Sequence, residues 1–216
     1  MSQIGLIFDM DGVIVDNNKY HFLAWQKLGE KYGINISPEY YKDNMNGRTI
    51  KELIRTVFKD IPEGDVSHLG EEKEATYRDL YKDLITPNKG IMSLLDLAKK
   101  EGIPMVVGTS APLANVEFTI DRLNLRDYFV DILDERAVTL GKPHPEIYLK
   151  CAKAINRDNA NCIVFEDAVS GIKAGKAAGS KVVGVATSHS REELDADMVI
   201  DNFEGFGLQQ IRSVLS

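Results

Sequence analysis

Short apolar runs alternate with amphipathic segments over most of this chain. Runs with strand character occupy 4–8, 104–108, 129–133, 162–165, 181–186 and 198–200. Segments with helical spacing of apolar residues occupy 93–100, 112–123, 145–155 and 169–178. Strands that are apolar along their whole length and alternate with helices indicate a parallel sheet covered by helices on both faces.

One segment, residues 18–85, breaks this alternation because its pattern predicts helices only. Its first helix carries Phe22, Trp25 and Leu28 at three-residue spacing, and later helices are expected to begin near Thr49 and Asp65. The strand at the N-terminus belongs with the strands that follow residue 104. The helical segment is therefore expected to be an insert.

These patterns together predict an α/β fold, with a doubly wound, Rossmann-like parallel sheet as the core domain and an inserted all-helical cap domain. The expected core comprises residues 1–16 and 87–216, and the expected cap comprises residues 17–86. A chain of 216 residues is long enough to bury one large core beside a smaller insert.

Composition narrows the class of partner. The hydrophobic content of 44% and charged content of 27% are ordinary for a soluble globular protein. The net charge of −7 argues against nucleic acid or an anionic membrane surface as the main partner. A small anionic substrate remains compatible with this charge, because a bound cation can reverse the local field.

The ends of the chain and its cysteines carry no sign of export. The N-terminus leads directly into a strand without a basic, apolar signal region, and no apolar run is long enough to span a membrane. Cys151 and Cys162 show no paired spacing and are expected to be buried free thiols. We expect a cytoplasmic monomer without membrane contact.

Four groups of reactive or charged residues lie at predicted strand ends or just before a predicted helix. They are Asp9 with Asp11, Thr109 with Ser110, Lys142, and Glu166 with Asp167. Each group alone has an ordinary reading as a turn, a helix cap, a helix-dipole charge or a solvated lysine. Because ligands bind beyond the carboxyl ends of parallel strands, their joint occurrence favours one functional site.

The charges of this expected site point to a metal ion. Asp9, Asp11, Glu166 and Asp167 carry four negative charges and Lys142 one positive charge, which leaves an excess of three negative charges. A phosphate dianion would not enter such a site unaided. Mg²⁺ suits a site made of a few carboxylates plus phosphate, and the backbone N–H groups after Thr109 can cradle an anion.

These motifs, in this order, resemble those of the haloacid dehalogenase superfamily. The sequence Asp9-x-Asp11-Gly12 is similar to its first motif, Thr109 to its second and Lys142 to its third. Glu166-Asp167, within the run from Phe165 to Gly175, is similar to its fourth. The resemblance spans the whole chain, and the helical insert lies where that family places its cap.

The resemblance implies a mechanism of phosphoryl transfer. Asp9 would attack phosphorus and form an aspartyl phosphate, and Asp11 would serve as general acid and then general base. Lys142 and Thr109, followed by Ser110, would hold the phosphoryl oxygens. Mg²⁺ would be bound by Asp9, by the carbonyl oxygen of Asp11 and by Asp167, with Glu166 close by or acting through water.

The branch of the superfamily is less sharply specified. The stretch 17–25 resembles the β-phosphoglucomutase subfamily, in which a histidine at the position of His21 helps couple cap closure to proton transfer. A histidine packed beside Trp25 is an equal alternative. Lys73 falls where a cap lysine would meet substrate, but its charged run, residues 71–74, also fits a solvated helix face. Arg48 is displaced from the subfamily's Gly-x-Ser-Arg pattern, although it could substitute.

We therefore expect a Mg²⁺-dependent phosphatase of small phosphorylated metabolites, with sugar phosphates as the favoured class. The alternative is a β-phosphoglucomutase-type isomerase that uses the same aspartyl phosphate. A response-regulator receiver is disfavoured by the order of Thr109 and Lys142 and by the helical insert. An EF-hand is disfavoured because Gly12 is fourth in its loop and follows a strand.

Overall fold

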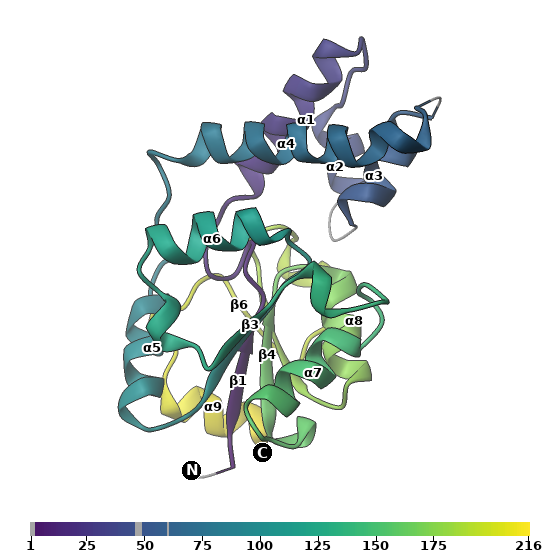
Figure 1. Ribbon diagram of the computed structural model, residues 1–216. Coiled ribbons are helices and arrows are strands. Elements are labelled where there is room, and N and C mark those ends of the chain that lie inside the picture. Colours follow the sequence, from purple (N-terminus) through teal and green to yellow (C-terminus); the bar gives the residue numbers. More distant parts are fainter. Residues whose placement is uncertain (1–2, 46–48, 60) are drawn as a thin grey trace. The chain divides into compact units, whose positions relative to one another are not determined.

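The computed structural model describes residues 3–45, 49–59 and 61–216 (Figure 1). The chain divides into two compact units. One unit joins the residues up to Asp16 with Thr86–Ser216, and the other is Asn17–Ile85. The first contains a β-sheet with its helices, and the described residues of the second form helices without a strand.

The sheet of the first unit has six strands in the order β3-β2-β1-β4-β5-β6. All neighbouring strands are parallel. The strands are β1 (Gly5–Phe8), β2 (Met105–Gly108), β3 (Asp131–Leu133), β4 (Cys162–Glu166), β5 (Lys181–Val185) and β6 (Met198–Ile200). The chain winds outwards from β1 in both directions, which confirms the doubly wound α/β fold that the sequence predicts.

The helices of this unit cover both faces of the sheet. They are α5 (Ile91–Lys100), α6 (Leu113–Arg122), α7 (Glu146–Ala154), α8 (Val169–Ala177) and α9 (Leu208–Leu215). Ile7 and Val164 pack in one hydrophobic cluster with residues of α7 and α8. On the other face, Phe8 stacks on Phe165 with ring centroids 4.8 Å apart, and Phe206, just before α9, meets Phe165 edge-on.

The strand register decides which residues meet at the carboxyl edge of the sheet. Phe8 of β1 lies opposite Val107 of β2 and Phe165 of β4. The next residue of each strand therefore emerges at the same level, and these residues are Asp9, Gly108 and Glu166. The centre of the sheet thus brings one carboxylate from β1 beside one from β4.

The described residues of the second unit include four α-helices. They are α1 (Asn18–Lys31), α2 (Pro38–Asn44), α3 (Ile50–Val57) and α4 (Val66–Tyr81). Residues from these helices, including Trp25, Ile54 and Leu69, form their own hydrophobic core. Thr49 caps α3 through a reciprocal capping box with Glu52, which fixes the helix start near the predicted position.

Short 3₁₀ turns complete the described secondary structure. They occupy Glu63–Asp65, Arg126–Tyr128, Glu135–Ala137, Asn159–Asn161 and Arg191–Glu193. Of the helices in the described ranges, none combines the length and the apolar character that crossing a membrane requires.

Candidate active site

Asp9 lies directly beyond the central strand β1 and is almost fully buried, with 7% of its surface exposed. Its backbone N–H donates to the carbonyl of Phe165 at 3.0 Å, which continues the ladder between β1 and β4. Burial raises the pKa of Asp9 to about 7, against the opposing effect of Lys142. A carboxyl group with this pKa lacks a full set of compensating charges.

Lys142 reaches this buried carboxylate from the loop that precedes α7. Its ammonium donates to Asp9 Oδ1 and to Glu166 Oε1 at 2.7 Å each, and to the carbonyl of Gly108 at 3.3 Å. Only 6% of its side chain is exposed, so Lys142 is not a solvated surface lysine. Burial alone would lower its pKa, but Asp9 and Glu166 outweigh burial and raise the pKa of Lys142.

Glu166 ends β4 and uses both carboxylate oxygens within the protein. Oε1 accepts from Lys142 and from the Tyr148 hydroxyl, at 2.7 and 2.6 Å. Oε2 accepts the backbone N–H groups of Asp167 and Ala168 at 2.9 and 3.0 Å. Because each oxygen already accepts two hydrogen bonds, Glu166 is better placed to orient Lys142 than to bind a metal directly.

Asp9, Glu166 and Asp167 form the one candidate metal-binding group found among the described residues. Their ligand atoms lie within 4.8 Å of one another, and all three residues are buried. Burial and the neighbouring charges of Glu166 and Asp9 raise the pKa of Asp167 well above its usual value. Three buried carboxylates against one ammonium fit a divalent cation with oxygen ligands.

Asp11 lies two residues beyond Asp9, in the turn after β1, and is half-buried. Its carboxylate is not part of the group formed by Asp9, Glu166 and Asp167. That Asp11 offers a metal its backbone carbonyl stays a prediction. The negative charge of Asp11 still contributes to raising the pKa of Asp9, so the two side chains of the first motif are electrostatically coupled.

The loop after β5 supplies two contacts that the sequence reasoning missed. The Ser188 hydroxyl donates to Asp167 Oδ2, and the Thr187 hydroxyl donates to the carbonyl of Gly12 at 2.7 Å. Gly12 has φ +74°, and a Cβ there would overlap the Asp167 carboxylate. The sequence signal for this loop is its position directly after β5, at the carboxyl edge of the sheet.

Thr109 and Ser110 follow β2 at the same edge of the sheet. Thr109 is buried, and its hydroxyl oxygen accepts the backbone N–H of Ala111 at 3.1 Å. The backbone N–H of Thr109 donates to Leu133 at 2.9 Å. Ser110 is half-buried. The turn that leads into α6 is thus organised by the Thr109 side chain, whose hydroxyl hydrogen can still serve as a donor.

In the helical unit, two of the expected substrate-binding residues meet each other. Lys73 donates to His21 Nδ1 at 2.6 Å and to Glu74 Oε1 at 2.9 Å. Lys73 is buried, with 2% of its surface exposed, so the solvated helix face considered as an alternative is wrong. The His21 ring stacks on Tyr77 at a centroid distance of 3.8 Å. Arg48, the third expected residue, lies outside the described part of the chain.

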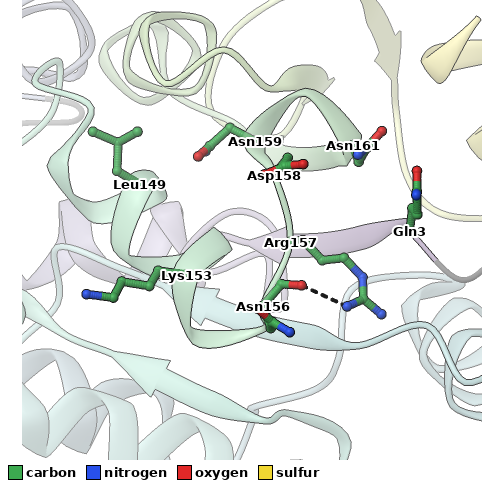
Figure 2. A pocket seen from close by; sticks show the side chains of 8 residues that line it. All are labelled: Gln3, Leu149, Lys153, Asn156, Arg157, Asp158, Asn159 and Asn161. Carbon is green, nitrogen blue, oxygen red and sulfur yellow. Dashed lines mark hydrogen bonds between the residues drawn. The ribbon is translucent and has the colours of Figure 1, made fainter.

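A polar hollow lies at the amino ends of β1 and β4, whereas Asp9 and Glu166 lie at the carboxyl ends of the same strands (Figure 2). It has a volume of about 540 Å³, and its lining includes Lys153, Arg157 and Asn159. Arg157 is engaged there by the protein itself, because it donates to the carbonyls of Ile4 and Asn156 at 3.2 and 2.8 Å. The hollow is therefore separate from the carboxylate group and shares no residue with it.

Comparison with known proteins gives consistent results. Residues 6–197 match a family model described as haloacid dehalogenase-like hydrolase. A fructose-1-phosphate phosphatase of Escherichia coli is 33% identical over 84% of this chain and 95% of its own length. A β-phosphoglucomutase of Bacillus subtilis is 32% identical over 90% of this chain and 88% of its own length.

Solved structures show the same fold. A crystal structure of a HAD hydrolase of family IA, variant 3, from Entamoeba histolytica matches with a TM-score of 0.91 and 29% identity. The match covers 98% of this chain and 99% of that one. Both the sheet and the helical insert therefore fall within the matched region.

Proposed function

The chain belongs to the haloacid dehalogenase-like hydrolases, and from this premise we propose that it is a Mg²⁺-dependent phosphatase of small phosphorylated metabolites, above all sugar phosphates. One observation carries the proposal. At the carboxyl end of the central strand, three buried carboxylates lie together, and a single buried lysine pairs with two of them. This excess of negative charge suits a site that recruits a cation together with a phosphate dianion.

Asp9 is the proposed nucleophile. A carboxylate oxygen of Asp9 attacks phosphorus, the bond from phosphorus to the ester oxygen breaks, and an aspartyl phosphate forms. Asp11 donates the proton that the departing alcohol needs. In the second half of the reaction, Asp11 removes a proton from water as that water attacks phosphorus. Inorganic phosphate leaves, and the Asp9 carboxylate is regenerated.

The remaining residues of the site stabilise the charge of the phosphoryl group and position it together with Mg²⁺. Lys142 already lies 2.7 Å from Asp9 Oδ1, where it can stabilise negative charge that develops on the phosphoryl oxygens. Thr109 and Ser110 are the proposed donors from the loop after β2. Asp9, Asp167 and the Asp11 carbonyl would hold Mg²⁺, with Glu166 orienting Lys142. When bound, Mg²⁺ neutralises phosphate charge and lowers the cost of attack by an anionic nucleophile.

The substrate class rests on the relatives. The Escherichia coli relative is named for fructose 1-phosphate, and a further relative from Thermotoga maritima is named a phosphorylated carbohydrates phosphatase. Phosphorylated sugars are therefore the first class to test for this chain. Within the helical unit, His21, Lys73 and Arg48 are the candidates for selecting among them.

A phosphoglucomutase-type isomerase is the second candidate, favoured by the Bacillus subtilis relative named β-phosphoglucomutase. Both candidates use the same aspartyl phosphate and differ in what accepts the phosphoryl group. Water is the acceptor in a phosphatase, and a sugar hydroxyl is the acceptor in a mutase.

A panel of phosphorylated metabolites tests both candidates. Purified protein would be incubated with Mg²⁺ and each substrate, including β-glucose 1-phosphate with catalytic glucose 1,6-bisphosphate. Inorganic phosphate and glucose 6-phosphate would be followed in the same tube. The proposal expects phosphate release in multiple turnovers that stops when EDTA removes the metal. Glucose 6-phosphate forming faster than phosphate would establish the mutase instead, and neither product would refute both candidates.

A further inference from the structure

Tyr148 is a buried phenol in α7 that the reaction proposed above does not use. Tyr148 is fully buried, with none of its surface exposed to solvent. Its hydroxyl donates to Glu166 Oε1 at 2.6 Å, and the Lys142 ammonium lies 4.9 Å from its ring centroid. One side chain therefore contacts both the carboxylate and the ammonium on which the site depends.

Every proton of the Lys142 ammonium has a hydrogen-bond acceptor. The three protons of its ammonium match three acceptors, Asp9 Oδ1, Glu166 Oε1 and the Gly108 carbonyl. Asp9 and Glu166 therefore compete for one cation at the same distance of 2.7 Å. The Tyr148 hydroxyl shares Glu166 Oε1 with that cation.

We propose that Tyr148 is a positioning residue, which sets how the Lys142 ammonium is shared between Glu166 and Asp9 by donating to Glu166 Oε1. Its catalytic consequence rests on the proposed phosphatase function, but its structural consequence does not. Tyr148 has no contact with the reacting atoms in this account. It acts through Glu166 and Lys142.

Removal of the hydroxyl would change this balance. Of the two donors to Glu166 Oε1, Tyr148 and Lys142, only Lys142 would remain. A buried carboxylate that loses one donor attracts its remaining ionic partner more strongly. The ammonium would then be drawn towards Glu166 and away from Asp9. A small displacement of a charged group next to the nucleophile costs rate even when substrate binding is preserved.

Tyr148→Phe tests the catalytic consequence, with Tyr128→Phe as the matched control. Tyr128 also donates its hydroxyl to a carboxylate, Asp96 Oδ1, at 2.6 Å, but it touches none of the site residues named above. We expect kcat of Tyr148→Phe to fall about 10- to 100-fold with an unchanged KM, whereas Tyr128→Phe keeps the wild-type kcat. A kcat of Tyr148→Phe equal to that of the control would overturn the proposal, as would a loss confined to KM.

The ¹⁵N resonance of the Lys142 ammonium gives a second readout that needs no turnover. A buried ammonium with three acceptors exchanges its protons slowly, and the signal can be assigned by its absence from Lys142→Arg. We expect the signal to move in Tyr148→Phe and to stay in place in Tyr128→Phe. An unmoved signal in Tyr148→Phe would contradict the proposal. If the wild-type protein released no phosphate, the proposed function would fail while this test of Tyr148 still stood.

Discussion

The two units of the molecule each contain a buried polar cluster built around a lysine, and the two clusters differ in charge. The core cluster places Lys142 against Asp9 and Glu166, with Asp167 alongside. The helical-unit cluster comprises Lys73, Glu74 and His21. Both lysine side chains are at least 94% buried. The core cluster has three carboxylates for its lysine, and the helical-unit cluster has one.

This difference in charge balance sets the core cluster apart as the one that suits a cation. Buried charges are stable when they are paired and hydrogen-bonded. Lys73 and Glu74 satisfy that condition by themselves, while the core cluster keeps two more negative charges than positive ones. Burial raises the pKa values of Asp9 and Asp167, and the neighbouring carboxylates raise them further. An excess of negative charge at the carboxyl edge of a parallel sheet, where ligands of such folds bind, favours the binding of a cation.

The largest expected effect is that of Asp9→Asn on turnover. A neutral amide cannot form the aspartyl phosphate, so kcat should fall by at least about 10⁴-fold. The protein should stay folded, because the substitution also removes one of three neighbouring negative charges. Phosphate release would be measured beside thermal unfolding. A variant with near-normal turnover would refute Asp9 as the nucleophile.

The next largest effect is expected in the helical-unit cluster, on stability. Lys73→Met removes the buried ammonium that pairs with Glu74 and should lower the free energy of unfolding by about 3–5 kcal/mol. The double variant Lys73→Met/Glu74→Gln should recover part of this loss, since no buried carboxylate remains in the pair. Urea unfolding would measure both. A double variant as unstable as the single one would show that the pair is not what stabilises this unit.

Addition of Mg²⁺ should stabilise the wild-type protein, and more so at higher pH. Burial raises the pKa of Asp9 from 3.8 to about 7, so the metal-free folded state holds this proton more tightly than the unfolded state. The contribution of Asp9 to the stability of the metal-free protein therefore falls as the pH rises from about 3.8 to about 7. Mg²⁺ requires the deprotonated carboxylate, so its stabilising effect should grow as pH rises.

Thermal unfolding at pH 5.5 and pH 8, with and without Mg²⁺, measures this linkage. At a free Mg²⁺ concentration about 100 times the dissociation constant, the stabilisation should approach about 2.7 kcal/mol. If Mg²⁺ raised Tm equally at the two pH values, its binding would not depend on deprotonation of these carboxylates.

A smaller effect is expected for Ser188→Ala. Its hydroxyl donates to Asp167 Oδ2, and loss of a hydrogen bond that orients a metal ligand should weaken Mg²⁺ binding about 10-fold. Ser93→Ala, on the exposed surface of α5, is a suitable control. If the two variants bound Mg²⁺ with equal affinity, Ser188 would have no part in orienting Asp167.

Much of the core unit could be predicted because the ends of buried strands can be recognised in a sequence. An apolar run that stops at a charged residue marks the carboxyl edge of a strand, and the parallel register of β1, β2 and β4 brings those edges together. Tyr148 could not be predicted in the same way. It lies in the apolar pattern of α7, where an aromatic residue reads as core, and its hydroxyl partner is distant in the sequence.

The helical unit shows where local patterns mislead. Lys73 lies in a run of charged residues, which favours a solvated face, yet Val66, Leu69, Lys73 and Tyr77 repeat at helical spacing and are all buried. The period, rather than the composition of the run, indicated the buried face. Helix α2 was missed because its sequence, PEYYKDN, is short and mostly polar. Helix α9 was also missed, although its apolar residues follow a helical period.

Calorimetric titration of Mg²⁺ into the wild-type protein and Asp167→Asn tests the central claim most directly, with the exposed Asp127→Asn as control. The claim is that the core cluster, with its excess of negative charge, binds a metal ion. We predict one Mg²⁺ site per chain in the wild-type protein and in Asp127→Asn, and loss of that site in Asp167→Asn. Absence of binding to the wild-type protein, or equal binding to Asp167→Asn, would contradict the account.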